Sequence, residues 1–89
     1  MSLTFPRQNR QLDAEAANVM FPGQNGEKTV SCRITSEALR ERLGAGPAAT
    51  ELLATFDRNR ARIESMAARK YDLGDSSATV SVTLTPADL

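Results

Sequence analysis

The hydrophobic period of the chain changes twice, and this pattern limits the folds available to it. Apolar and polar side chains alternate over residues 27–34 and again over residues 78–85, which is the period of a half-buried β-strand. Between residues 48 and 71 the period becomes that of one helical stripe, formed by Leu52, Phe56, Ile63, Met66 and Ala67. In a chain of 89 residues, this pattern favours helices packed on one face of a small sheet.

The N-terminal third predicts a β-hairpin. Val19 and Phe21 alternate in residues 17–21, and the strand 27–34 follows the segment Pro22-Gly23-Gln24-Asn25-Gly26. Asn-Gly between two such strands favours a type I′ turn, which needs positive φ at both central residues. Residues 3–5 are a candidate edge segment that Pro6 would end. The polar, alanine-rich residues 7–16 are compatible with a further strand near residues 10–12.

Capping signals divide the middle of the chain. Thr35-Ser36 offers an N-cap for a helix over residues 37–43, and Gly44 suits its C-terminal cap. Gly46-Pro47 is expected to open a second helix of about residues 48–71, which Gly74 ends. We therefore predict a single α+β domain over residues 1–89. Its small antiparallel sheet has the order β-β-α-α-β, with room for an extra N-terminal strand, and two helices cover one face.

Composition argues against several functions. Lys plus Arg equal Asp plus Glu at 11 each, whereas nucleic-acid binders usually carry a basic excess. The chain has no His and one Cys, so the commonest general base and metal ligand is missing. The sequence contains no phosphate-binding loop motif and no apolar run of membrane-spanning length, and its first residues lead us to expect no signal peptide. We expect a cytoplasmic protein that is no enzyme, binds no cofactor or metal, and has no contact with a membrane.

The single cysteine is expected to be buried and inert. Cys32 shares the predicted core face of its strand with Val30 and Ile34, where a thiol behaves as a small hydrophobic group. Arg33 projects from the opposite face, and no His is available to activate the thiol.

The basic residues of the long predicted helix are the candidate partner-binding residues. Arg58, Arg62 and Arg69 fall on one face opposite the apolar stripe. Arg60 lies within the apolar arc, between Asp57 and Glu64, which could both pair with it. Lys70 lies on the other edge of the stripe. Solvated surface arginines and an arginine lying along the edge of the stripe are the alternative interpretations of these residues.

Several short segments resemble a known family. They are Leu3-Thr4-Phe5-Pro6, Phe21-Pro22, the spaced run from Phe56 through Arg60, Ile63 and Ala67 to Lys70-Tyr71, and the ending Leu84-Thr85-Pro86-Ala87-Asp88-Leu89. Together they are similar to the small bacterial domain-of-unknown-function family 1488. Leu12 departs from the pattern, because an aromatic residue is expected before Asp13. The resemblance implies an antiparallel sheet with helices, a bacterial source and no established activity.

Two hypotheses about function follow. The first is a non-enzymatic protein-interaction or regulatory module that binds a protein partner or self-associates as a homodimer. It would use a sheet face, a sheet edge or the surface of the long helix. The second is weak nucleic-acid binding through Arg58, Arg62 and Arg69.

Overall fold

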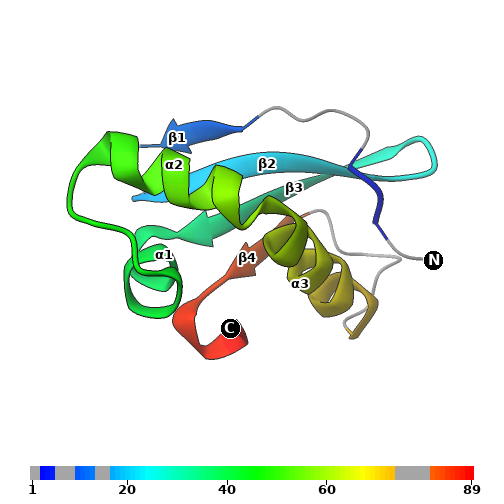
Figure 1. Cartoon of the computed structure of the whole chain (residues 1–89). Helices are drawn as coiled ribbons and strands as arrows, with labels where there is room; N and C mark the ends of the chain where they lie inside the picture. Colours follow the sequence, from blue (N-terminus) through cyan, green and yellow to red (C-terminus); the bar gives the residue numbers. More distant parts are fainter. Residues whose placement is uncertain (1–2, 6–9, 14–16, 74–80) are drawn as a thin grey trace.

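One sheet with helices on one side forms the architecture (Figure 1). The computed structural model describes residues 3–5, 10–13, 17–73 and 81–89. Within them the sheet has the order β1-β2-β3-β4. In chain order the elements are β1 (Gln11–Asp13), β2 (Asn18–Asn25), β3 (Lys28–Thr35), α1 (Ser36–Leu43), α2 (Ala49–Arg58), α3 (Arg60–Leu73), β4 (Ser81–Leu84) and the 3-10 helix η1 (Pro86–Asp88). The α+β class is confirmed, and β1 is the extra N-terminal strand.

The hairpin is present, but its turn lies one residue further along than the sequence suggested. Asn25 pairs with Lys28, so the two loop residues are Gly26 and Glu27. Gly26 has φ of 65°, and Glu27 is not among the positive-φ residues, which is the pattern of a type II′ turn rather than type I′. Pro22 and Gly23 therefore belong to β2 rather than to the turn. Pro22 fits there because β1 pairs only with residues 18–20, so its missing N–H faces no partner in β1.

The sheet is mixed, which corrects the prediction of an antiparallel sheet. β1, β2 and β3 are antiparallel neighbours, but β4 runs parallel to β3 and pairs Cys32 with Val82 and Ile34 with Leu84. Three helices lie between these two strands in the chain. A connection of that length can bring the chain back to the same end of the sheet, as parallel pairing requires. For the last strand, predicted over residues 78–85, residues 78–80 lie outside the described residues, as does Gly74.

All the strand residues of the core come from one face of the sheet. On β2 and β3 these are the positions predicted from the alternation, and β4 adds two more. The buried apolar residues are Leu3, Val19, Phe21, Val30, Cys32, Ile34, Ala38, Leu39, Leu52, Phe56, Ile63, Ala67, Tyr71, Val82 and Leu84. Met66, predicted for the same stripe, is only half-buried.

The segment 3–5 packs along β2, as predicted for an edge segment. Thr4 and Gln24 exchange two backbone hydrogen bonds of 2.8 Å. Gly23 makes this approach possible, because a Cβ at that position would lie 3.1 Å from the Phe5 ring and 3.3 Å from Cys32 Sγ. Such contacts are tighter than ordinary packing allows, so a larger residue would push the segment away.

The long predicted helix is two helices, because Asn59 interrupts it. Asn59 has φ of −114° and ψ of 17°, and its side-chain amide donates a 2.9 Å hydrogen bond to the carbonyl of Thr55. Asparagine commonly competes with the helical backbone in this way. The buried stripe nevertheless continues through the break, from Leu52, Thr55 and Phe56 to Ile63, Ala67 and Tyr71.

The caps of the first helix are confirmed, but the start of the second differs. Thr35 Oγ1 accepts a 3.1 Å hydrogen bond from the N–H of Ala38, and Gly44 ends α1 with φ of 77°. The second helix begins at Ala49 after the N-cap Ala48, so Pro47 lies outside it. Its N-cap makes no side-chain hydrogen bond, which leaves packing rather than capping to define this end.

We predict that truncating Phe56 destabilises the domain far more than removing three surface arginines. Phe56 is fully buried, so Phe56→Ala should cost about 3–5 kcal/mol through lost burial and a cavity. Replacing Arg58, Arg62 and Arg69 together by Gln should change the free energy of unfolding little, because all three are exposed. Urea denaturation of both variants measures the difference. A triple variant less stable than Phe56→Ala would contradict the placement of the stripe.

Candidate functional site

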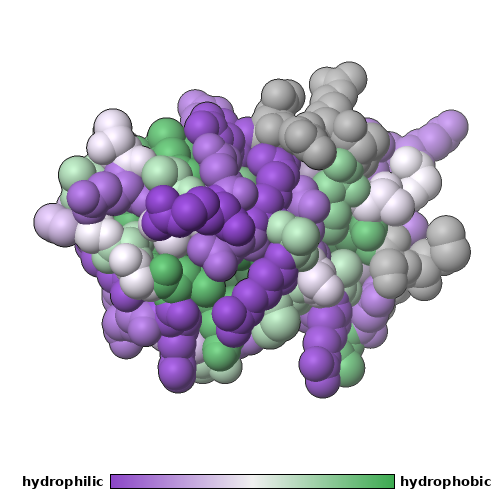
Figure 2. Space-filling view, in the orientation of Figure 1, coloured by the Kyte–Doolittle hydropathy of each residue, from purple (hydrophilic) through white to green (hydrophobic). Residues whose placement is uncertain are grey.

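The five basic residues singled out in the sequence do not form one cluster. Arg58 ends α2, and Arg62 and Arg69 lie beyond the break at Asn59, two helical turns apart on α3. All three are exposed, and Arg58 donates a 3.2 Å hydrogen bond to Thr55 Oγ1. Hydrophilic and hydrophobic side chains are mixed over the face of the molecule shown in Figure 2.

Arg60 contacts residues of both α2 and α3. Its Nε lies 2.8 Å from Glu64 Oε2, as predicted, and its guanidinium carbon lies 5.2 Å from the centre of the Phe56 ring. The side chain is only 15% exposed. A guanidinium stacked on a ring and paired with a carboxylate has a structural role in joining α2 to α3.

Asp57, the other predicted partner of Arg60, forms its ion pair elsewhere. Arg10 donates from Nε and Nη2 to the two carboxylate oxygens of Asp57, each at 3.0 Å. This bidentate hydrogen bonding lowers the pKa of Asp57 and raises that of Arg10. The pair connects the start of β1 to the end of α2. Its partners are 47 residues apart, and no local pattern links them.

Lys70 is also engaged within the fold. Its ammonium donates to the carbonyl oxygen of Thr83 at 2.6 Å and to Asp88 Oδ2 at 2.9 Å. Burial alone would raise the pKa of Asp88, but hydrogen bonds from Thr85 and Lys70 lower it overall. These contacts tie α3 to β4 and η1 and use two of the three N–H donors of the Lys70 ammonium.

The second face of the sheet is a different kind of surface, and we call it the open face. It points away from the core, and the helices of Figure 1 lie on the other side. Alternation and register assign to it Gln11, Asp13, Asn18, Met20, Pro22, Gln24, Thr29, Ser31, Arg33, Thr35, Ser81 and Thr83. Among the described residues of this face, Asp13 and Arg33 are the charged members. Hydroxyl, amide and apolar side chains make up the rest, in contrast to the charged helix surface.

Arg33 lies in the middle of the open face. Its β3 position pairs with Met20 of β2 on one side and with Thr83 of β4 on the other. Arg33 is part-exposed, but its Nε is buried and has no hydrogen-bond acceptor among the described residues. The Oδ1 atom of Asn18, a residue only 5% exposed, is the other buried side-chain atom without a partner in the described part of the chain. The sequence placed Arg33 on this face but gave no reason to select it.

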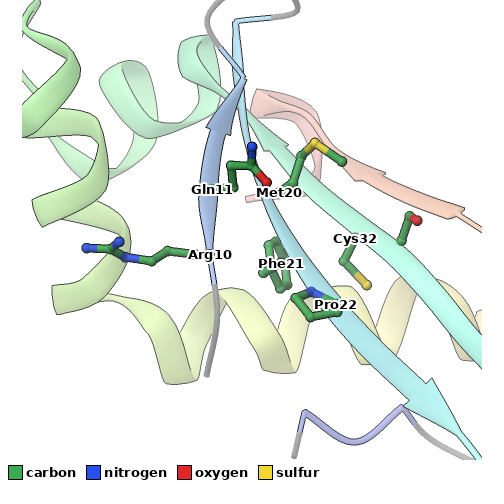
Figure 3. A pocket seen from close by; sticks show the side chains of 7 residues that line it. Arg10, Gln11, Met20, Phe21, Pro22 and Cys32 are labelled. Carbon is green, nitrogen blue, oxygen red and sulfur yellow. The ribbon is translucent and has the colours of Figure 1, made fainter. Parts of the chain in front are cut away.

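A shallow hollow opens beside β1 and the middle of β2 (Figure 3). Its volume is about 430 Å³, and its lining residues are Arg10, Gln11, Met20, Phe21, Pro22, Ser31 and Cys32. In Figure 3, Arg10 points away from the other lining side chains, consistent with its ion pair to Asp57. The described lining residues include no carboxylate, so they provide no acid–base pair.

Cys32 is buried, as the strand alternation predicted. It is 1% exposed, and burial followed by the charge of Glu64 raises its pKa to about 11. The thiol is therefore protonated at neutral pH and shielded from reagents, the opposite of a nucleophilic cysteine. Among the described residues, no group of three potential metal ligands comes together, and no helix is long and apolar enough to cross a membrane.

Comparisons with known proteins place this geometry in a family. The family model of the protein of unknown function DUF1488 matches residues 3–84. The chain belongs to the DUF1488 family. A crystal structure of a DUF1488 protein of unknown function from Shewanella loihica PV-4 is similar, with a TM-score of 0.67, 19% sequence identity and 91% of each chain covered. This likeness supports the fold, and the family membership confirms the resemblance seen in the sequence. No curated protein matches the chain.

We predict that Cys32 of this DUF1488 chain reacts slowly with a thiol reagent. Both burial and a pKa near 11 keep the reactive thiolate scarce at pH 8, whereas an unfolded cysteine titrates near 8.5. Labelling with an aromatic disulfide reagent in buffer and in denaturant gives the two rates. Rapid stoichiometric labelling of the folded chain would contradict both the burial and the phase of β3.

Proposed function

We propose that this DUF1488 chain is a non-enzymatic protein-interaction module, with a regulatory role in the bacterial cytoplasm, that docks a protein on its open face. The observation that carries the proposal is the difference between the two faces of the sheet. One is covered by helices, and the other presents a nearly uncharged surface that no described helix covers.

Physical chemistry favours such a surface for docking. Cores of protein interfaces are depleted of charged residues, because a charge is costly to desolvate. Ser31, Ser81 and Thr83 can exchange water for a partner's polar groups, and Met20 adds an adaptable apolar contact. Strand pairing fixes the backbone beneath these side chains, so little ordering of the backbone opposes binding.

The chemistry of the described residues supports a non-enzymatic role. Cys32 is a protonated thiol in the core, and the carboxylates of Asp57, Glu64 and Asp88 each pair with a basic residue. The residues described around the hollow beside β1 include no pair of groups suited to proton transfer. The described open face, by contrast, has side chains suited to protein recognition.

Site-specific photo-crosslinking tests this proposal. A photoreactive phenylalanine at Ser31, an exposed open-face position, should give a discrete protein adduct in cells of the native host. The same group at Ala61, exposed on α3, is the matched control. Mass spectrometry of the adduct separates a second copy from a different protein. No adduct at Ser31, or the same adduct at both positions, would contradict docking on the open face.

Weak nucleic-acid binding is the alternative, and the exposure of Arg58, Arg62 and Arg69 favours it. Against it, α2 and α3 together carry five basic and four acidic residues, a net charge of only +1. Phosphate binding requires a local cationic surplus and weakens steeply with salt.

The expected result is that the chain does not shift the fluorescence anisotropy of labelled duplex DNA or RNA at physiological salt. Any low-salt binding should be the same for the wild type and for the triple variant of Arg58, Arg62 and Arg69 to Gln. Binding that falls steeply with salt and is lost in the triple variant would favour the alternative.

A further inference from the structure

Arg33 is the feature of the open face that strand formation does not explain. Thr29, Ser31 and Thr35 occupy equivalent positions on β3 and satisfy the alternation with small hydroxyl side chains. A long cation is placed instead at the centre of the face, between Met20 and Thr83. Within the described residues it makes no ion pair and no hydrogen bond.

The state of the guanidinium indicates which chemistry it would bind. Its Nε is already shielded from water without an acceptor, so part of the desolvation cost of binding has been met in the free protein. The remaining N–H donors belong to the planar terminal amino groups, which match the two oxygens of a carboxylate. Neutral neighbours such as Met20 and Thr83 provide no competing anion.

The position of Arg33 also bears on the kind of partner. β3 is an inner strand with neighbours on both sides, so Arg33 lies near the middle of the face. A two-fold symmetric dimer centred on that face would bring two guanidinium groups together, because an isologous contact sets each central residue against its own copy. Like charges at a desolvated contact are unfavourable. A different protein with an opposite charge avoids this conflict.

We propose that Arg33 is the anion-recognition position of the open face, and that it receives an Asp or Glu side chain from an otherwise uncharged segment of another protein. This inference rests on the proposed docking function and specifies the chemistry of the partner. Charge complementarity at one central position, within a nearly neutral surface, is the argument for it. The carboxylate fixes register, while the neutral surroundings provide contact area.

A phage-displayed random peptide library, selected on the full chain, tests the proposal. Enriched peptides should carry an Asp or Glu among uncharged residues. Their affinity, measured by fluorescence anisotropy with synthetic peptide, should fall about ten- to hundredfold for Arg33→Gln. The peptide with its acid changed to the amide should lose the same factor. Combining the two changes should cost little more than either alone, because both remove one interaction.

Matched controls separate binding from folding. Arg33→Lys keeps the charge but not the two-pronged geometry, and should recover part of the affinity; Arg62→Gln, on α3, should leave it unchanged. Circular dichroism and thermal melting check that each variant is folded. Library selection that enriches no peptide, peptides without an acid, or affinity unchanged in Arg33→Gln would overturn the proposal. So would a dimer, seen by light scattering, that Arg33→Gln leaves intact and Ser31→Glu dissociates.

The two proposals fail separately. An adduct from the photoreactive group at Ser31, together with peptide binding that does not depend on Arg33, would support docking on the open face and contradict carboxylate recognition by Arg33. Absence of the adduct, with no acidic peptide enriched, would remove both.

Discussion

The contact on which the fold depends most is the stack of Phe21, Phe56 and Arg60. The rings of Phe21 and Phe56 lie 5.1 Å apart, and the Arg60 guanidinium covers Phe56. Phe5 extends the stack from the N-terminal segment, 5.9 Å from Phe21. These four residues belong to four different segments of the chain, including the sheet and both long helices. With only four aromatic residues available, most of the aromatic surface is used to join these layers.

Local sequence patterns predicted much of this fold, whereas the features that depend on long-range pairing could not be predicted from them. Alternation gave the correct faces of β2 and β3, and Thr35 and Gly44 marked both ends of α1, because each signal depends on near neighbours. The parallel pairing of β4 depends on residues about fifty positions away, so sequence order alone suggested the wrong direction. The helix break at Asn59 could not be predicted for a different reason. Its break leaves the buried stripe in phase, and the stripe was the evidence for one helix.

The candidate site was harder to predict, because a basic residue looks the same in sequence whether it is free or paired. Arg60 and Lys70 were selected for lying along a buried stripe, and in the structure that position gives them partners in the fold itself. Asp57 pairs with Arg10, which lies 47 residues away in the sequence, rather than with Arg60. Arg33 shows no such signal in the sequence, because a strand residue facing away from the core carries no local indication of function. Only the register of three strands places it at the centre of a face.

The two faces of the sheet divide the tasks of stability and recognition. The core face includes Val30, Cys32 and Ile34, whose burial leaves them no route to a partner. On the helix side of the molecule, Asp57 pairs with Arg10 and Asp88 pairs with Lys70, and a partner would have to break those pairs to use these side chains. The described open face differs in both respects, because most of its side chains are neutral and outside the core, and Arg33 has no described counter-charge. A shielded donor without an acceptor lowers stability, whereas a hydroxyl side chain at that position would not. The Arg33 guanidinium provides N–H donors and a positive charge that do not stabilise the fold and that a docked carboxylate would bind.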